Sequence, residues 1–292
     1  MDWWIGIQNA IDYVEEHIAE DINYEEIAKK ASYSGFYFQR IFGAVCGMSL
    51  GEYIRNRRLT LAGNELNSSN VKVIDIALKY GYESPESFTR AFSKFHGITP
   101  SEAKKDGSKL KAFSRISVKI TVSGGSLMDY KIVEKEAFEV IEKVEIHTTE
   151  NGANLKSVPA FWDRANADGT SDELLSLASE KTYLFGVCYA NKNENEKTFE
   201  YSIAAACDKD TPIPQGYRRN FIPARTWAVF ACVGAMPNAI QDTWKKICTE
   251  FFPHSAYQPT RELDIEAYPD GDVSSAEYRC EIWLPVEKKN KT

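Results

Sequence analysis

Residues 28–49 read AKKASYSGFYFQRIFGAVCGMS, and residues 77–99 read ALKYGYESPESFTRAFSKFHGIT. The second stretch repeats the pattern of the first, with one inserted residue in its middle. A pattern that recurs in this way indicates one supersecondary unit used twice. In each copy a short helix, a tight turn and a second helix follow one another, which is typical of the helix-turn-helix motif. The matched positions are Ala28 with Ala77, Lys30 with Lys79, Tyr33 with Tyr82, Phe38 with Phe88, Arg40 with Arg90, Phe42 with Phe92 and Gly47 with Gly97.

An all-α domain over residues 1–107 is predicted around these two units. Ser49 and Glu52 form a capping box that begins a long helix, and Ser84 followed by Pro85 begins the last helix of the second unit. The long helix would separate the two reading helices. Reading helices that enter successive major grooves lie about 34 Å apart, so this arrangement predicts a chain that reads two segments of one DNA face.

The run IDIALKYGYESPESFTRAFSKFHGITPSEAKK (75–105) is similar nearly throughout to the signature of the AraC/XylS family of bacterial transcription regulators. The resemblance covers the first third of the chain. It implies seven helices, with two helix-turn-helix units joined by one helix. It also implies that the two reading helices expose these residues to DNA: Phe36, Gln39 and Arg40 in the first, and Pro85, Glu86, Ser87, Thr89 and Arg90 in the second.

The side chains at these positions suit different contacts with DNA. Gln39 can pair with adenine through two hydrogen bonds, and Arg40 can pair with guanine in the same way. Arg90 can bind guanine or a phosphate, whereas Pro85 offers no donor and Glu86 repels phosphates unless it accepts from a cytosine. We therefore expect the first unit to carry most of the base specificity and the second unit mostly to contact the DNA backbone.

Structural roles for the basic residues stay open in the sequence. Arg40 and Arg90 occupy equivalent positions of the repeat, and either could form an ion pair that holds the domain together. Residues 34–107 hold ten basic and seven acidic side chains, although the whole chain has a net charge of −7. This local excess favours a limited DNA-binding surface over general polyanion binding. Three further arginines on the long helix suit phosphate contacts or structural pairing: Arg55, Arg57 and Arg58.

Residues 108–126 are predicted to form a linker. Asp106-Gly107-Ser108 and Ser123-Gly124-Gly125-Ser126 have the composition of turns. Between them, RISVKITV (115–122) alternates between apolar and polar residues like a strand.

A second domain over residues 127–292 is predicted to be α+β. The order strand, helix, strand, strand occurs twice in it, and Trp162 and Trp244 lie at equivalent places in the two helices. This pattern predicts two pseudo-repeated units whose two helices cover one face of an antiparallel sheet.

The stretches FFPHSAYQPTRELDIEAYP (251–269) and SAEYRCEIWLPVEK (275–288) are similar to the GyrI-like effector-binding domain. An AraC-type reader followed by such a domain resembles the Rob-type regulators. This resemblance implies a small, often lipophilic or cationic ligand, bound between the two repeats around a glutamate of the last strand. The matching residue in this sequence is Glu281.

The alternation of side chains along a strand supports a site at this glutamate. Trp283 falls on the same face as Glu281, and Tyr183 and Tyr189 fall on one face of an earlier strand. A carboxylate among aromatic rings attracts an organic cation by charge pairing and cation–π contact. The alternative is that Glu281 pairs with an arginine on an exposed face and that the rings belong to the core. Two further residues line the mouth of the groove or pack in the core: Trp162 and Trp244.

Composition limits the remaining function classes. The six cysteines form no Cys-x-x-Cys pair and the four histidines are scattered, so neither a metal site nor a cofactor is expected. No stretch approaches the roughly 20 apolar residues of a membrane span, and no export signal is recognised, so a cytoplasmic location without membrane partners is expected. The expected partners are double-stranded DNA, a small organic effector and RNA polymerase.

The chain is accordingly interpreted as a ligand-modulated regulator of transcription, acting as an activator and without catalytic residues. Two alternatives remain for the second domain. It could be a small-molecule hydrolase in which Glu281 activates water, or it could dock a protein partner without binding a ligand.

Overall fold

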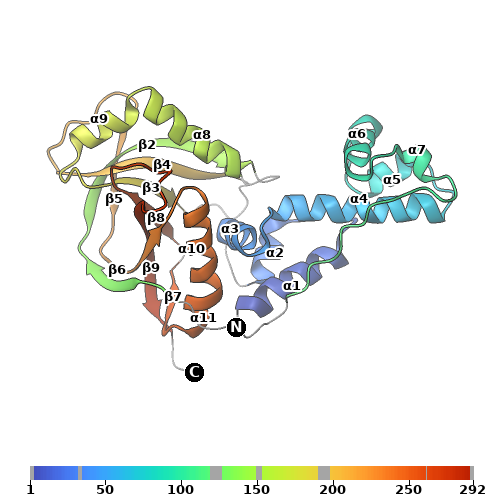
Figure 1. Cartoon of the computed structure of the whole chain (residues 1–292), viewed down its shortest axis with the longest axis horizontal. Coiled ribbons are helices and arrows are strands. Elements are labelled where there is room, and N and C mark those ends of the chain that lie inside the picture. Colours follow the sequence, from blue (N-terminus) through green and yellow to red (C-terminus); the bar gives the residue numbers. More distant parts are fainter. Residues whose placement is uncertain are drawn as a thin grey trace. The chain divides into compact units, whose positions relative to one another are not determined.

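A computed structural model describes residues 3–31, 35–118, 127–148, 153–189, 198–260 and 262–289. Contacts between residues divide the chain into two compact units (Figure 1). The first comprises residues 1–35 and 48–121, and the second comprises residues 36–47 and 122–292.

The first unit is helical, as predicted for the N-terminal part of the chain. Its helices are α1 (Trp3–Glu16), α2 (Tyr24–Lys30), α4 (Leu50–Ser68), α5 (Val73–Lys79), α6 (Pro85–His96) and α7 (Pro100–Ala103). The helix of the first repeat, α3 (Gly35–Cys46), is grouped with the second unit.

The second repeat packs on the long helix α4 through an apolar core. Phe88 and Phe92 of α6 are fully buried, together with Leu59 and Leu66 of α4 and Ile76 of α5. The predicted start of α6 is confirmed, because the Ser84 hydroxyl accepts from the backbone N–H of Ser87 and Pro85 occupies the first turn. These contacts fix the outward face of α6.

Residues 108–118, predicted to be linker, pack instead along the helices of the first unit. The Phe113 N–H donates to the Thr60 hydroxyl (2.9 Å), and the Val118 N–H donates to the Gln8 side chain (2.9 Å). No strand forms over 115–118, because these backbone groups bond to helix side chains and not to a neighbouring strand; the rest of the predicted strand, 119–122, lies outside the described residues. Residues 108–118 therefore pack with the first unit.

The second unit is built on an antiparallel sheet with helices, as predicted. The strands are β1 (Tyr130–Lys135), β2 (Phe138–Thr148), β3 (Leu184–Tyr189), β4 (Thr198–Cys207), β5 (Arg218–Ile222), β6 (Arg225–Val233), β7 (Tyr257–Pro259), β8 (Leu263–Tyr268) and β9 (Arg279–Lys288). Their order is β1-β6-β9-β8-β3-β4-β2-β5, with β7 paired to β9. The helices are α8 (Asn154–Ala167), α9 (Thr170–Leu177), α10 (Asn238–Lys246), a π-helical turn (Ile247–Phe251) and α11 (Phe252–His254). The sequence did not predict α9 or β7.

The sheet must curl, because short connections join its opposite ends. Residues 136–137 alone link β1, at one end of the order, to β2 near the other end, and residues 223–224 link β5 to β6 in the same way. The inner face encloses a core that includes Trp227, Phe185 and Trp283. Helices α8, α9 and α10 lie on the outer face, against β2, β4 and β6 (Figure 1).

Candidate functional site

The exposed face of α6 carries the charged residues predicted to meet DNA. Glu86, Arg90 and Lys94 are all exposed and follow one another at four-residue spacing, opposite the buried Phe88 and Phe92. Arg90 forms no ion pair with any described residue. The guanidinium is therefore available to a phosphate or a base edge.

Two other predicted residues of α6 are half-buried. The Ser87 hydroxyl donates to the Ser84 carbonyl oxygen (2.8 Å), so this hydroxyl takes part in the start of the helix. Thr89 is half-buried on the next turn. The side chains of Ser87 and Thr89 are therefore less accessible to DNA than those of Glu86 and Arg90.

The three residues predicted on the first reading helix all belong to α3. Gln39 is half-buried in this helix. The side chains of Phe36 and Arg40 lie outside the described part of the structure.

Arg57 and Arg58 have structural partners, in agreement with one of the two roles left open for them. Arg57 forms an ion pair with Glu15 (2.8 Å) and donates to the Phe113 carbonyl oxygen, and the Tyr53 hydroxyl donates to the same carboxylate (2.7 Å). Arg58 donates to the carbonyl oxygens of residues 18 and 20. Both guanidinium groups thus join α4 to the segment around α1, whereas Arg55 is exposed.

The six residues predicted to bind a ligand lie in two groups, on opposite faces of the sheet. Glu281, Trp283, Tyr183 and Tyr189 lie on the inner face. The rings of Tyr183 and Trp283 contact Phe185, which makes them part of the enclosed core. The other two predicted residues belong to α8 and α10, and their side chains pack against the outer face of the sheet: Trp162 and Trp244.

Glu281 and Trp283 share one face, as their spacing predicted. The Trp283 indole N–H donates to the Glu281 carboxylate (2.7 Å), and Lys131 of β1 forms an ion pair with its other oxygen (3.1 Å). The ammonium of Lys135 covers the Trp283 ring at 4.2 Å from the centroid. Glu281 is thus paired with a lysine instead of the arginine considered from the sequence.

Tyr189 belongs to a different polar group of the inner face. Its hydroxyl donates to the carboxylate of Glu142 (2.6 Å), which is fully buried. Ser202 and Arg218 also donate to this carboxylate (2.7 and 2.6 Å). These bonds satisfy the buried charge inside the sheet, as a structural group requires.

A carboxylate that the sequence did not single out lies beside Trp244 on the outer face. Glu266 of β8 is nearly buried, at 9% exposure. One of its carboxylate oxygens accepts from the Trp244 indole N–H (3.0 Å), and the other accepts from the Tyr268 hydroxyl (2.9 Å). The Trp162 indole N–H donates to the Tyr201 hydroxyl (2.9 Å), and the Trp162 ring meets Tyr268 edge-on at 5.2 Å. We call these five residues, Trp162, Tyr201, Trp244, Glu266 and Tyr268, the Glu266 cluster.

The Glu266 cluster draws its members from both helices and from central strands. Trp162 comes from α8 and Trp244 from α10, while the strands supply Tyr201, Glu266 and Tyr268. Gly186 lies directly opposite Glu266 on β3. A Cβ atom at residue 186 would lie 2.1 Å from the Tyr201 hydroxyl, so the glycine leaves the room that this hydroxyl occupies.

The electrostatics of the cluster set its chemistry. Burial, together with the adjacent Glu266 carboxylate, raises the pKa of Tyr268 well above its usual range, so this phenol stays a neutral donor. A buried carboxylate among aromatic rings is suited to an organic cation, because charge attraction and the electron-rich ring faces act together in a low-dielectric setting. No residue of the cluster is a nucleophile of the serine or cysteine type.

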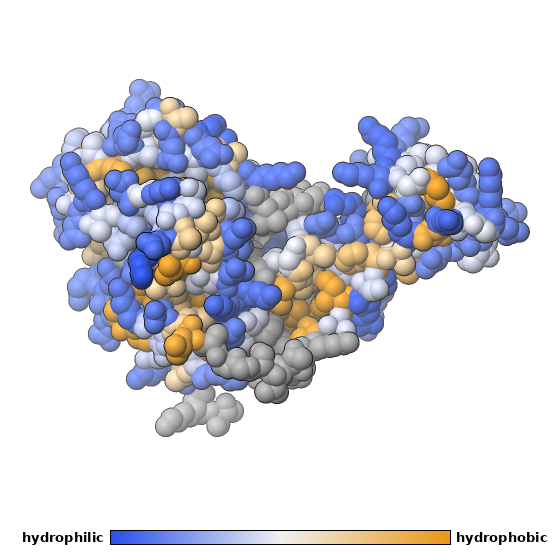
Figure 2. All heavy atoms as spheres, in the orientation of Figure 1, coloured by the Kyte–Doolittle hydropathy of each residue, from blue (hydrophilic) through white to orange (hydrophobic). Residues whose placement is uncertain are grey.

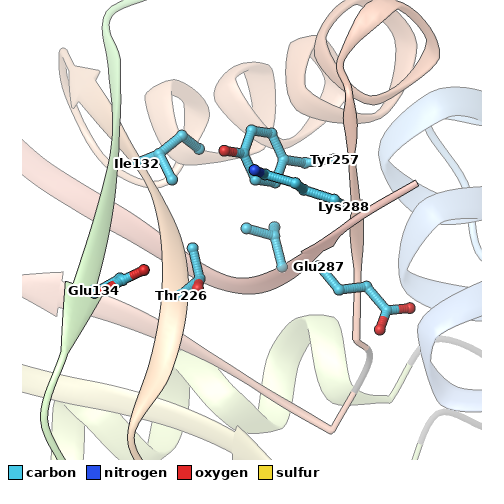
Figure 3. Close-up of a pocket in the computed structure, with 7 residues that line it drawn as sticks. Ile132, Glu134, Thr226, Tyr257, Glu287 and Lys288 are labelled. Atoms are coloured by element: carbon cyan, nitrogen blue, oxygen red, sulfur yellow. The ribbon is translucent and has the colours of Figure 1, made fainter. Parts of the chain in front are cut away.

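A cavity of about 460 Å³ lies elsewhere in the second unit, lined by residues of β1, β6, β7 and β9. Figure 3 shows its carboxylates Glu134 and Glu287 on opposite sides, with the Tyr257 ring and Lys288 at one end. Its polar groups do not converge on one point, and it includes no residue of the Glu266 cluster.

The remaining general findings concern the surface, the helices and the thiols. In the face shown in Figure 2, hydrophilic side chains predominate and apolar ones are exposed between them. Among the described residues, no helix is long and apolar enough to cross a lipid bilayer. All six cysteines are free thiols, and no group of three or more His, Cys, Asp or Glu side chains in the described part of the chain is arranged to hold a metal ion.

Comparison with known proteins assigns a family to each part of the chain. Residues 128–287 match the model of the GyrI-like small molecule binding domain, and residues 27–106 match a helix-turn-helix domain of the AraC type. The regulatory protein SoxS of Salmonella typhimurium is 44% identical over 96 residues, which are 33% of this chain and 90% of that protein. The transcriptional activator AarP of Providencia stuartii is 40% identical over 95 residues, or 32% of this chain and 70% of that protein.

A solved structure is also similar to part of the chain. The structure of SAV2435 bound to tetraphenylphosphonium is 22% identical, with a TM-score of 0.49, and the match covers 55% of this chain and 94% of that one.

Proposed function

We propose that the protein is a transcription regulator controlled by a lipophilic organic cation that binds at the Glu266 cluster. The chain belongs to the GyrI-like small-molecule-binding family, and this domain is joined here to an AraC-type helix-turn-helix domain. The regulator function follows from this pair of families and from relatives that are named as regulators and activators of transcription. The ligand class follows from the chemistry of the Glu266 cluster.

One observation carries the ligand proposal: a nearly buried carboxylate, Glu266, is bound by Trp244 of α10 and by Tyr268, whose ring contacts Trp162 of α8. Taking a carboxylate out of water costs several kcal/mol. Such a group, placed among Trp162, Tyr201 and Tyr268, supports a binding role because a cation offsets that cost. A cation that inserts between Trp162 and Trp244 would change the distance between α8 and α10, which gives the ligand a mechanical effect.

We assign DNA contact to the exposed face of α6 and to α3. Arg90 is assigned to the DNA backbone, and Gln39 with Arg40 to base edges. Arg57 and Arg58 are assigned structural roles, since each already binds groups near α1. The DNA-reading part is proposed to include residues 108–118, which pack on its helices, and the sensing part to begin near residue 127.

Several finer assignments complete the proposal. The strand-helix-strand-strand order on each side of the cluster supports a duplicated origin, with Trp162 and Trp244 as equivalent residues. The protein is proposed to act as an activator that recruits RNA polymerase, and to have no catalytic activity. A hydrolase built on Glu281 is disfavoured, because Lys131 and Trp283 already bind both oxygens of that carboxylate.

The experiment that tests the function is footprinting of the full-length protein on the region upstream of its own operon, across a salt series. A footprint spanning about two helical turns, weakened by salt with a slope of a few phosphates, is expected, and a lipophilic cationic dye such as rhodamine 6G should change the footprint or the transcript level. No footprint at any salt concentration would contradict the regulator function. A footprint that responds to no cation would contradict the ligand class and favour a protein-docking role.

A further inference from the structure

Two buried cysteines face each other across neighbouring strands beside α10. Cys232 of β6 and Cys280 of β9 are direct partners in the antiparallel register, and they are 0% and 2% exposed. Directly paired residues project their side chains to the same face of a sheet. That face is the outer one, because Ile282, two residues from Cys280, lies opposite Glu266.

The backbone register of this pair brings it near the spacing of a disulfide. The Gly234 N–H donates to the Tyr278 carbonyl oxygen (2.9 Å) in the same register, two residues from Cys232 and Cys280. The cysteines therefore form a hydrogen-bonded pair, in which Cα atoms are about 5.5 Å apart, within the range of about 4.4–6.8 Å that disulfides span. The Cβ atoms of directly opposed residues lie about 4.5–5.5 Å apart, whereas those of a disulfide lie about 3.5–4.5 Å apart, so the bond requires β6 and β9 to move closer at this point.

The surroundings favour reaction at one of the two sulfurs. The neighbouring Cys280 thiol lowers the pKa of Cys232, whereas the same contact and burial raise the pKa of Cys280. Cys232 is one residue from the end of β6 and Cys280 is one residue from the start of β9, where strands open most readily to small molecules.

We propose that Cys232 and Cys280 form a reversible dithiol–disulfide pair that is oxidised by small peroxides and that couples oxidation to α10. The Cys232 thiolate attacks a peroxide oxygen, which breaks the O–O bond and gives a sulfenic acid on Cys232 and, with one proton, water or an alcohol. The Cys280 sulfur then attacks the Cys232 sulfur, so that the S–S bond forms and the S–O bond breaks. The departing hydroxide takes the Cys280 proton and leaves as water, and an external thiol restores the pair.

Oxidation would act on the neighbouring Glu266 cluster through α10; this part rests on the proposed ligand function. Cys232 lies on β6, the strand against which α10 packs, and the indole of Trp244 in α10 binds Glu266. We expect the disulfide to draw β6 toward β9 and to shift α10, which lowers the affinity of the cluster for a cation.

The chemistry is tested on the full-length protein by treatment with hydrogen peroxide, alkylation of the remaining thiols, proteolysis without reductant and mass spectrometry. We expect a peptide pair joined through Cys232 and Cys280, two hydrogens lighter than the separate peptides and released by dithiothreitol. Cys232→Ser and Cys280→Ser should each abolish it, whereas Cys248→Ser, which removes another buried thiol, should keep it. Alkylation of both cysteines after peroxide treatment, or linkage to other cysteines, would overturn the proposal.

The coupling is tested by titrating rhodamine 6G into the reduced and the oxidised protein. An affinity at least threefold lower after oxidation, unchanged by peroxide in Cys280→Ser, is expected, and equal affinities would overturn the coupling. If the reduced protein binds no dye, the proposed ligand and the coupling both fail, while the joined peptide still decides the thiol chemistry.

Discussion

The Trp244 indole N–H donates to the Glu266 carboxylate across 3.0 Å, which ties α10 to the central strand β8. Trp162 reaches the same region from α8 through the Tyr201 hydroxyl. Each of the two helices thus meets the sheet through a tryptophan. A ligand that replaces either contact would move a whole helix, which gives a physical route from binding to regulation.

The two reading helices are expected to make different contacts with DNA, with bases through α3 and with phosphates through α6. Gln39→Ala should cost about 1–3 kcal/mol of DNA binding and relax base preference at one position, because a bidentate adenine contact is lost. Arg90→Ala should weaken binding to all sequences alike and reduce the salt slope by about one phosphate. Binding selections on randomised operators, repeated at several salt concentrations, measure both effects. Equal relaxation of base preference by the two variants would contradict this division.

Arg57 is expected to contribute to stability and not to DNA contact. Arg57→Ala would leave the Glu15 carboxylate, only 11% exposed, without its cation, and loss of one partner of a buried ion pair costs about 3 kcal/mol. Thermal unfolding measures this loss. Arg55→Ala, at an exposed position of the same helix, is the control and should change stability by less than about 0.5 kcal/mol. A normal melting temperature for Arg57→Ala would show that the ion pair with Glu15 is not stabilising.

The packing of Tyr201 is expected to depend on Gly186. Gly186→Ala places a methyl group against the Tyr201 hydroxyl and should destabilise the second unit by about 2 kcal/mol. Tyr201→Phe removes that hydroxyl, so the double variant should recover at least about 1 kcal/mol relative to the sum of the single changes. Chemical denaturation of the four proteins gives the coupling energy, and strict additivity would be the contrary result.

Residues 108–118 are expected to loosen from the first unit in mild acid. Burial lowers the pKa of His96, whose Nδ1 accepts from the Lys111 N–H (3.2 Å) and whose Nε2 contacts the Leu59 carbonyl oxygen. The unfolded chain takes up this proton near pH 6.5, so the contribution of neutral His96 is complete above that pH and is lost as the pH falls through the lower folded value. The protection factor of the Lys111 amide, its exchange rate relative to that of an unprotected amide at the same pH, should therefore fall over this window.

The matched controls are His96→Gln and His254→Gln, the second at an exposed position. His96→Gln should remove the pH dependence of the Lys111 protection factor, and His254→Gln should leave it intact. A Lys111 protection factor that does not change between pH 8 and pH 5 would contradict the role of His96.

The local signals of the sequence predicted most of the elements but not their partners. Ser84 and Pro85 predicted the start of α6 because capping depends on neighbouring residues alone. The ion pair of Arg57 with Glu15 and the packing of Phe113 on α4 join residues far apart in the chain, and neither leaves a periodic pattern. For that reason residues 108–118 were predicted to be linker.

The choice between Glu266 and Glu281 shows the same limit. Both carboxylates lie in strands, and alternation places each on a face without saying which face the helices cover. That depends on the strand order, in which β8 and β9 are neighbours and the inner face closes around Trp283. The motif LDIEAY (263–268) places a glutamate and a tyrosine two residues apart, and therefore on one face of a strand. The motif alone does not show that this face lies under α10, which supplies Trp244 to Glu266.

The most direct test of the account is the affinity of rhodamine 6G for Glu266→Gln and Glu281→Gln, measured by fluorescence titration beside the unmodified protein. Glu266→Gln should weaken binding at least tenfold, about 1.4 kcal/mol, because it removes the buried charge and keeps an acceptor for Trp244. Glu281→Gln should bind within about twofold, since that carboxylate lies on the other face and pairs with Lys131. Loss of binding in Glu281→Gln with full binding in Glu266→Gln would contradict a ligand site at Glu266.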